Sequence, residues 1–382
     1  MNKQQLITDL QSRGLRISGA SAGAEGRRGG AGPSDHKAVT IDGTTVMVPI
    51  YTGTATQSPY FLQGSELKSV EWITGPPPAE HPINNHQAGN LRRDDQIEDI
   101  GAAIAFPPRP KFYDLTTADG TPYWKIALLH SRDVLATTVL QMCKRYRDPA
   151  TACQFCAIEQ SLTAGRTVAR KHPEQLAEVA AAAVALDGVT HMVMTTGTPS
   201  TPDRGASHLT ACAAAVKARV DLPIQAQCEP PDDFAWFGRM KAAGVDSLGM
   251  HLEAVDPVVR ARIMPGKAEI PVSRYFEAFA AAVKVFGWGQ VSTYLLAGLG
   301  DTVETLVSAC DRLIDAGVYP FVVPFVPITG TPLEQHPAPS SEFMAAVYGA
   351  VGDKLHRSGM SSVAMKAGCG KCGACSALSL FE

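Results

Sequence analysis

The sequence predicts an α/β fold: a partial (β/α)6 TIM-like barrel with a small β-rich N-terminal region and a cysteine-containing C-terminal tail. Two observations support this fold class. From about residue 131 to residue 335, short apolar segments alternate six times with longer helical segments, which is typical of a parallel sheet with right-handed crossovers. Before residue 130, alternating β-branched runs separated by turn residues indicate antiparallel hairpins instead.

The composition is that of a globular protein with one large or two smaller domains. The chain has 382 residues, of which 45% are hydrophobic and 19% charged, and a net charge of −3. This charge gives no electrostatic reason to expect nucleic acid or a membrane as a partner. No run approaches the roughly 20 apolar residues of a membrane span, and the polar start lacks the apolar core of a signal peptide. We therefore expect a cytoplasmic protein, in which clustered cysteines bind metals or clusters more often than they form disulfides.

The N-terminal region, residues 1–130, contains two predicted hairpins and two predicted loops. The hairpins turn at Asp-Gly pairs, residues 42–43 and 119–120, because Asp-Gly between alternating runs favours a tight turn. The stretch SGASAGAEGRRGGAGPSD is predicted to be a flexible loop, since no strand precedes it and no Gly-Lys-Ser/Thr follows as in a phosphate-binding loop. His81 and His86 lie in a proline-rich loop, where exposure to solvent is favoured over metal binding.

The barrel region, residues 131–335, carries the six repeats, and its helices have recognisable ends. Pro173 falls in the first turn of one helix and Gly188 follows its last turn. The predicted strands span residues 133–142, 189–197, 222–229, 247–253, 290–300 and 319–328. The predicted helices span residues 172–188, 208–220, 232–244, 272–287 and 302–317, with a last helix over 340–359.

The segment VLQMCKRYRDPATACQFCAIEQ holds three cysteines where the first barrel strand ends. Cys143 is followed after nine residues by Cys153, and Cys156 comes two residues later, directly after Phe155. In α/β barrels the chemistry takes place at the carboxyl ends of the strands. A structural zinc site normally has four protein ligands, whereas an iron–sulfur cluster on three thiolates leaves one iron open for another ligand. A zinc site or cysteines scattered in the core are the alternatives.

This pattern resembles the radical S-adenosylmethionine (SAM) superfamily, in which three cysteines follow the first strand of a partial (β/α)6 barrel and an aromatic residue precedes the third. The nine-residue gap, longer than the commoner three, marks a variant loop. The resemblance implies a [4Fe-4S] cluster on Cys143, Cys153 and Cys156, with SAM on the open iron. It implies an enzyme in which reductive cleavage of SAM gives a 5′-deoxyadenosyl radical that abstracts hydrogen from a small-molecule substrate. The implied electron donor is a protein such as flavodoxin or ferredoxin.

The resemblance also assigns residues to SAM binding. Thr195, Thr196 and Gly197 occupy the place of the family's Gly-Gly-Glu motif, whose backbone carbonyls hold the SAM amino group. Leu296 lies in YLLAGLGDT, which resembles the fifth-strand motif whose backbone packs on adenine. The resemblance covers about residues 133–334.

Alternation along the third and fourth strands predicts acidic residues that face the barrel interior. A period of two places Gln225, Gln227 and Glu229 on one face of the third strand, and His251 with Glu253 on one face of the fourth. Buried carboxylates need partners: a cationic SAM or substrate is one possibility, and ion pairs with barrel arginines are the equal alternative. His251 is predicted to position substrate or move a proton, or else to be a hydrogen-bonded barrel residue.

A basic segment follows the fourth strand. In the resembled family an arginine beyond this strand often fixes the SAM carboxylate, and Arg260 is the expected residue, with Arg262 and Arg274 close behind. A guanidinium suits bidentate contact with a carboxylate. An exposed helix face is the alternative for each of the three.

The C-terminal region, residues 336–382, ends in a second cysteine motif. CGKCGAC places Cys369, Cys372 and Cys375 with two residues between neighbours, which matches the first three ligands of a ferredoxin-type run. It predicts a second, auxiliary iron–sulfur cluster whose fourth ligand is open. A zinc knuckle or a redox-active tail is the alternative.

The N-terminal segment GAGPSDHKAV and its hairpin suggest a narrower resemblance, to the radical SAM subfamily encoded beside nitrilases in bacterial gene clusters linked to nitrile or cyanide use. Such a resemblance does not identify a substrate. The competing hypothesis is a non-catalytic iron–sulfur or zinc protein that acts as an electron carrier or sensor. It predicts bound metal without SAM chemistry.

Overall fold

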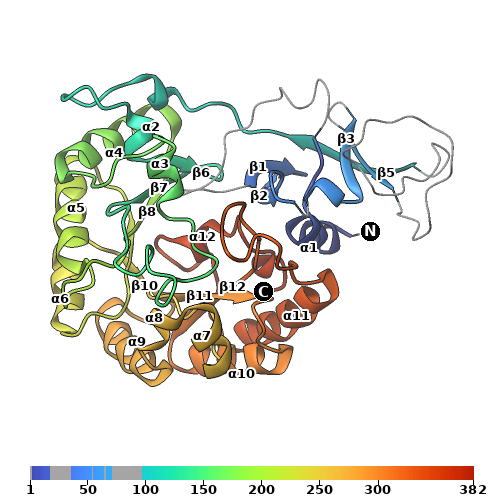
Figure 1. The fold of residues 1–382 in the computed structure, drawn as a ribbon. Coiled ribbons are helices and arrows are strands. Elements are labelled where there is room, and N and C mark those ends of the chain that lie inside the picture. The colour runs from blue at the N-terminus through green and yellow to red at the C-terminus, as the bar shows by residue number, and fades with distance from the viewer. Residues whose placement is uncertain (1, 18–35, 54, 64–65, 71–96) are drawn as a thin grey trace.

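A parallel sheet curled into part of a barrel forms the larger unit of the molecule (Figure 1). The computed structural model describes residues 2–17, 36–53, 55–63, 66–70 and 97–382. Strands β7 to β12 are parallel and adjacent in chain order, and β6 pairs antiparallel with β7 at one edge. The strands are β6 (Leu128–His130), β7 (Val134–Thr138), β8 (His191–Thr195), β9 (Ile224–Gln227), β10 (Ser247–Gly249), β11 (Val291–Ala297) and β12 (Val318–Pro324). The predicted partial (β/α)6 barrel is therefore confirmed.

Helices cover the outer face of this sheet (Figure 1). The first long helix, α4 (Pro173–Asp187), has Pro173 at its first position and ends where Gly188 adopts φ +65°, as predicted. The long helices are α4 (Pro173–Asp187), α5 (Ala206–Arg219), α6 (Ala235–Ala242), α9 (Val272–Phe286), α10 (Val303–Asp315) and α11 (Ser341–Ser358). Shorter ones are α2 (Tyr123–Ile126), α3 (Gln160–Thr163), α7 (Pro257–Ile263), α8 (Pro265–Ala268) and α12 (Cys369–Cys372).

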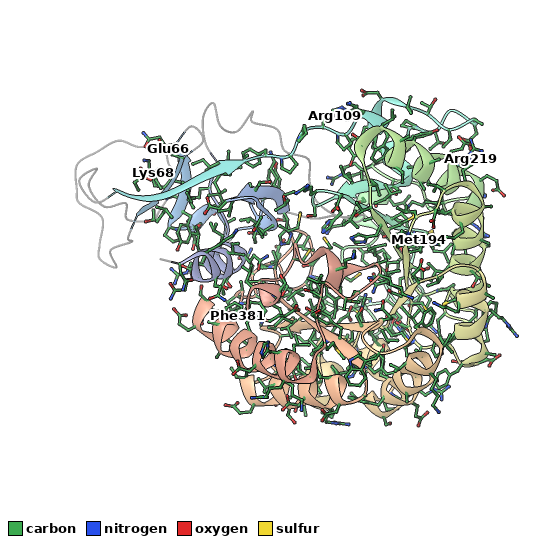
Figure 2. The ribbon with its side chains drawn as sticks, turned by 180° about the vertical axis from the view of Figure 1, so that it is seen from behind. Glu66, Lys68, Arg109, Met194, Arg219 and Phe381 are labelled. Carbon is green, nitrogen blue, oxygen red and sulfur yellow. The ribbon has the colours of Figure 1, made fainter. Side chains whose placement is uncertain are left out.

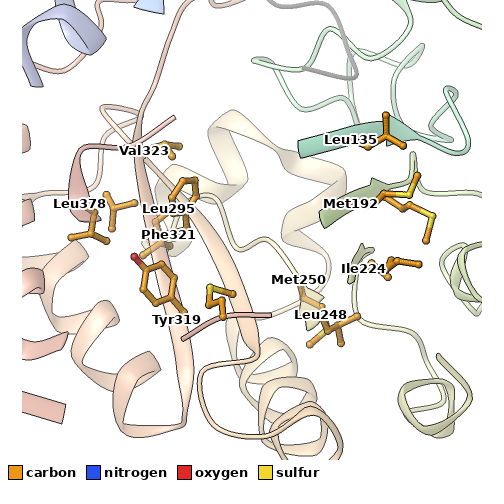
Figure 3. Packing of buried hydrophobic residues seen from close by; sticks show 14 of the residues in the cluster. Leu135, Met192, Ile224, Leu248, Met250, Leu295, Tyr319, Phe321, Val323 and Leu378 are labelled. Atoms are coloured by element: carbon orange, nitrogen blue, oxygen red, sulfur yellow. The ribbon is translucent and has the colours of Figure 1, made fainter. Parts of the chain in front are cut away.

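The apolar core lies between the barrel strands and the outer helices. Leu135, Met192 and Ile224 are register neighbours on three successive strands and are all fully buried (Figure 3). Seen from behind, side chains such as Met194 fill the same interior (Figure 2). Because one face of each strand packs against helices in this way, the other face is left to line the concave side of the barrel.

The N-terminal unit is a five-stranded antiparallel sheet with helix α1 (Lys3–Arg13). The predicted first hairpin is confirmed: Asp42 and Gly43 have φ of 46° and 77°, and Ile41 pairs with Thr44. The strand order is β2-β1-β5-β4-β3. The strands are β1 (His36–Ile41), β2 (Thr44–Pro49), β3 (Tyr60–Gln63), β4 (Glu66–Val70) and β5 (Ile97–Ala105). The glycine-rich stretch and the loop containing His81 and His86 lie outside the described residues.

The second predicted hairpin is wrong in its flanking strands. A turn forms with Gly120 at φ +83°, but it is bracketed by a single bridge between Thr116 and Pro122. Pro122 has no N–H group to continue a ladder, and the chain enters α2 directly after it. The residues that follow form β6, which joins the barrel sheet instead.

The C-terminal tail returns to the concave side of the barrel, where α12 lies (Figure 1). Gly368 precedes α12 with φ +115°, and a Cβ there would lie 2.3 Å from the amide of Gln225 on β9. The backbone N–H of Met47 on β2 donates to the carbonyl of Ala374 at 2.7 Å. The tail is thus held between the barrel strands and the N-terminal sheet. Within the described ranges, none of the helices has the length and apolar character needed to cross a membrane.

We predict that His191 makes the folded state sensitive to acid. His191 is 2% exposed and burial lowers its pKa to about 4, and its Nδ1 accepts the N–H of Gly368 at 3.3 Å. An unfolded histidine titrates near 6.5. The stabilisation of the folded state by neutral His191 is therefore fully present above about pH 6.5 and is lost as the pH falls toward about 4. Between pH 7.5 and 5.0 the titration of His191 lowers the free energy of unfolding by about 2 kcal/mol, at about 1.4 kcal/mol per pKa unit.

Urea unfolding at several pH values tests this. His191→Asn retains a hydrogen-bond acceptor without the titration and should lose about 2 kcal/mol less stability than the unmodified chain over that range. His356→Asn, at an exposed position of α11, is the matched control. Equal pH dependence of the His191→Asn variant and the unmodified chain would contradict the prediction.

Candidate active site

Cys143, Cys153 and Cys156 line one cavity of about 200 Å³, and they lie in the connection between β7 and α3. They come together because the connection folds back: the N–H of Cys156 donates to the carbonyl of Cys153 at 3.0 Å, and the N–H of Gln154 to the carbonyl of Ile263 at 2.8 Å. All three are free thiols. The predicted convergence of the three cysteines after the first barrel strand is therefore present in the structure.

The buried thiols of this cavity can ionise only if positive charge lies beside them. Burial raises the pKa of Cys156 to about 12 and that of Cys153 well above its ordinary value. Their thiolate forms therefore require a cation, and bound iron supplies one. Among the described residues no three His, Cys, Asp or Glu side chains are grouped as ligands of a single metal ion. The three thiols instead surround a space, and this donor set fits an iron–sulfur cluster.

Most of the other predicted site residues line the same cavity. Gly197 shows why a glycine is needed: a Cβ there would lie 2.2 Å from the carbonyl oxygen of Met142, the residue before Cys143. The β8 end can therefore lie directly against the cysteine loop. The predicted residues that line the cavity with the cysteines are Phe155, Thr195, Thr196, Gly197, Glu229, His251 and Glu253.

Both acidic residues have a basic partner in the cavity wall. Glu229 forms a buried ion pair with Arg145, and Glu253 forms one with Lys267 at 2.7 Å. The alternative of pairing within the barrel therefore holds, with a lysine as one of the partners. The second carboxylate oxygen of Glu229 is buried and has no hydrogen-bond partner among the described groups. An unsatisfied carboxylate oxygen is costly, and it marks this wall as one that a hydrogen-bond donor of a ligand would complete.

Arg145 and Lys267 are site residues that the sequence interpretation missed. Arg145 follows Cys143 by two residues, and Lys267 is the third residue of the short helix α8, in the motif MPGK. Position relative to the cysteines was the available signal for Arg145. Lys267 is brought to the cavity by the α7–α8 turn, and its pKa is raised above the ordinary value although burial opposes this, because Glu253 lies beside it.

His251 faces this cavity as a neutral ring. Its Nδ1 accepts the backbone N–H of Tyr294 at 3.2 Å, and its ring meets that of Tyr294 edge to face at 4.6 Å. Burial lowers the pKa of His251 to about 3. Since Nδ1 accepts, the hydrogen of the neutral ring is on Nε2. His251 is thus fixed by a hydrogen bond and can offer one donor to a ligand.

The structure does not bring Arg260 into the cavity. Its buried guanidinium donates to the carbonyls of Leu252 at 2.8 Å and Ala254 at 3.0 Å, and also to two carbonyls in and just after α8. A guanidinium bound to backbone carbonyls fixes the turn after β10 and has few donors left for a carboxylate. Arg262 donates to a backbone carbonyl as well, and Arg274 pairs with an acidic neighbour on its own helix.

Leu296 also lies apart from the cavity lining. It packs with Cys153 and Phe155 in a small apolar cluster behind the cysteine loop. Its N–H donates to the carbonyl of Glu253 at 2.7 Å, and Glu253 has the left-handed φ of 65°. A non-glycine residue in this region costs of the order of 1–3 kcal/mol. The pairing with Leu296 helps to hold the strained residue in place.

The tail cysteines line a second cavity, of about 150 Å³, inside the barrel. Gln227 donates to Sγ of Cys369 at 3.2 Å, and the N–H of Cys369 donates to the side chain of Gln225 at 3.2 Å. Both glutamines therefore lie on the inner face of β9, as the alternation predicts. The cysteines that line this cavity are Cys369, Cys372 and Cys375. The remaining ones, Cys212, Cys228 and Cys310, are buried.

The two cavities share a wall. Thr195 and Gln227 line both of them, so the two cysteine sets lie on either side of the β8 and β9 ends. At the far side of the tail cavity, Nε2 of His130 lies 3.5 Å from Sγ of Cys375. His130 was not singled out from the sequence, because it directly follows the segment that was interpreted as a second hairpin.

Comparison with known proteins gives a family match over the barrel. Residues 145–313 match the model of the radical SAM superfamily. The chain is 32% identical to the bacteriochlorophyllide c C-7(1)-hydroxylase of Chlorobaculum limnaeum over 135 residues, 35% of this chain and 33% of that protein. It is 27% identical to the lipoyl synthase of Marinobacter nauticus over 168 residues, 44% of this chain and 47% of that protein. The matched part thus spans half or less of these curated relatives.

Solved structures show similarity at low sequence identity. Methylornithine synthase has a TM-score of 0.46 and 17% identity, covering 64% of this chain and 67% of its own. A radical SAM methyltransferase from Sphaerobacter thermophilus has a TM-score of 0.43 and 15% identity, covering 71% of this chain and 73% of its own.

We predict that the pair of Lys267 and Glu253 contributes strongly to the stability of the cavity wall. Lys267→Met leaves Glu253 buried and unpaired, which costs about 3–5 kcal/mol of unfolding free energy. The double variant with Glu253→Gln should recover much of this loss. Lys354→Met, which breaks an exposed pair of 3.0 Å with Asp315, is the matched control and should cost less than about 1 kcal/mol. Equal losses in both single variants, measured by denaturant unfolding, would contradict the prediction.

Proposed function

We propose that this chain is a radical SAM enzyme, and that the cavity of Cys143, Cys153 and Cys156 holds a [4Fe-4S] cluster that binds SAM; the match of residues 145–313 to the superfamily model supports this. The observation that carries the proposal is the donor set: three free thiols of one loop, Cys143, Cys153 and Cys156, line one cavity. Cys228, at the end of β9, also lines this cavity, but it is buried in the apolar core. When bound, the cluster supplies the electron for reductive cleavage of SAM to a 5′-deoxyadenosyl radical, which abstracts hydrogen from a small-molecule substrate.

Different residues of the cavity wall bind different groups of SAM in this proposal. We assign the SAM amino group to the segment Thr195 to Gly197, whose close approach to the cysteine loop the glycine permits. We assign the SAM carboxylate to Lys267 in place of Arg260, because Lys267 is a charged donor in the cavity wall. The unpartnered oxygen of Glu229 accepts from a hydroxyl or amino group of the ligand. His251 donates from Nε2 and remains neutral.

The tail cysteines form the proposed site of an auxiliary iron–sulfur cluster. Its cavity shares Thr195 and Gln227 with the SAM cavity, so an auxiliary cluster lies next to the reaction site. A barrel interior closed by the tail would keep a carbon radical away from thiols and other hydrogen donors in solution, which would otherwise quench it. We further propose an external reductant such as flavodoxin or ferredoxin, and a membership in the nitrilase-linked subfamily. The proposed substrate is a small molecule.

The cluster assignment predicts the behaviour of a triple cysteine variant. Replacing Cys143, Cys153 and Cys156 by alanine should remove about four iron atoms per chain, the content of one cubane, and abolish 5′-deoxyadenosine formation. The assay is anaerobic reconstitution followed by dithionite and SAM. Cys212→Ala, at a buried position outside both cavities, is the control and should keep its iron.

Two outcomes would decide against the proposal. Unchanged iron content in the triple variant would show that the cluster does not bind in this cavity. Full iron content in the unmodified chain without 5′-deoxyadenosine would favour the competing function, an electron carrier or sensor.

The role of Glu229 gives a separate prediction. Glu229→Gln leaves the cysteines intact, so iron content should not change, but the ligand loses a charged acceptor. We expect the Kd for SAM to rise roughly tenfold, which corresponds to about 1.4 kcal/mol. Equilibrium binding of SAM to the reconstituted protein measures this, with Glu277→Gln on the exposed side of α9 as control. An unchanged Kd would exclude Glu229 from the SAM site.

A further inference from the structure

We propose that His130 is the fourth protein ligand of the tail cluster, so that this cluster is closed by the protein and has no iron open to substrate. This inference rests on the proposed auxiliary cluster. It assigns the ligand that the CGKCGAC motif lacks.

The position of His130 follows from the edge strand of the barrel. β6 pairs antiparallel with β7, and His130 is the last residue of β6, opposite Val134. Val134 lines the tail cavity, and so does His130. The three cysteines enter the cavity from α12 and the turn after it. The imidazole therefore reaches the site from another segment, and its Nε2 lies 3.5 Å from Sγ of Cys375.

The other polar groups of the cavity are poorer candidates. Of the described residues that line it, His130 is the one histidine, and no carboxylate lines it. The amide of Gln227 and the hydroxyl of Tyr294 both hydrogen-bond to Cys369. They support a ligand, as groups of an outer shell do around metal sites. The three cysteines outside the two motifs are buried elsewhere and do not line this cavity. Imidazole nitrogen is an established ligand of iron–sulfur centres.

Histidine ligation has a definite chemical consequence. A neutral imidazole in place of a thiolate makes the cluster one charge less negative, which raises its reduction potential. A cluster with four protein ligands holds no substrate on iron. The tail cluster would then exchange electrons with the neighbouring cavity across the wall of Thr195 and Gln227, while substrate binds elsewhere in the barrel.

The test uses the full chain in the Cys143→Ala, Cys153→Ala, Cys156→Ala background, so that the tail cluster is observed alone. With ¹⁵N-labelled histidine, pulsed EPR of the dithionite-reduced cluster should show a strong ¹⁵N coupling from a directly bound imidazole. His130→Ala should lose this coupling. His130→Cys should also lose it, but should keep about four iron atoms and have a lower midpoint potential. His356→Ala, on the exposed face of α11, should behave like the parent.

The outcomes separate the two levels of the proposal. A tail that binds no iron in this background would overturn the auxiliary cluster and the histidine ligand together. A cluster without the coupling, or with a coupling that survives His130→Ala, would overturn the histidine ligand and leave the auxiliary cluster standing. Loss of the coupling in His130→Ala and His130→Cys, with the cluster retained in the latter, supports the proposal.

Discussion

A buried thiolate needs compensating positive charge, and this requirement organises the interior of the barrel. Cys153 and Cys156 have raised pKa values because burial disfavours their thiolates. Bound iron would provide the positive charge that makes the thiolates stable. The fold brings two further cations to the same wall, Arg145 and Lys267, each beside a carboxylate. A ligand that carries both an ammonium and a carboxylate, as SAM does, matches this mixture of paired charges.

Sheet curvature decides which residues can share a site. The carboxyl ends of parallel strands converge on one side of the barrel, so loops far apart in sequence meet there. Glycines allow the closest approaches: Gly197 lies against the backbone before Cys143, and Gly368 lies against Gln225. The tail is held in place from the other side by the N-terminal sheet through Met47 and Ala374. The small N-terminal unit therefore contributes to the shape of the tail cavity without lining it, as far as the described residues show.

Local sequence patterns correctly predicted the features that depend on neighbouring residues. The repeated alternation gave six parallel strands in chain order, Asp42-Gly43 gave the first hairpin, and a period of two placed Gln225 and Gln227 on the inner face of β9. The second hairpin failed because Pro122 cannot continue a ladder. That error hid β6 and with it His130.

Long-range partners were not readable in the same way. The choice of Arg260 followed from residue type and position, yet its guanidinium is bound by backbone carbonyls that only the folded turn assembles. Lys267 was overlooked because its approach to Glu253 depends on the α7–α8 turn. Charge alone does not tell which basic residue points into the barrel. Tertiary packing between segments far apart in the sequence decides which basic side chain points inward, and local sequence patterns do not show these contacts.

The shared wall between the cavities links their chemistry. His251 lines the cavity of Cys143, Cys153 and Cys156 and is fixed by the N–H of Tyr294, whose hydroxyl hydrogen-bonds to Cys369 of the tail. Gln227 also contacts Cys369 and lines both cavities. A change of charge at either cysteine set therefore acts on the same polar side chains, with little water between to screen it. A tail site closed by a neutral ligand would keep this wall less negative, which favours the entry of electrons from that side.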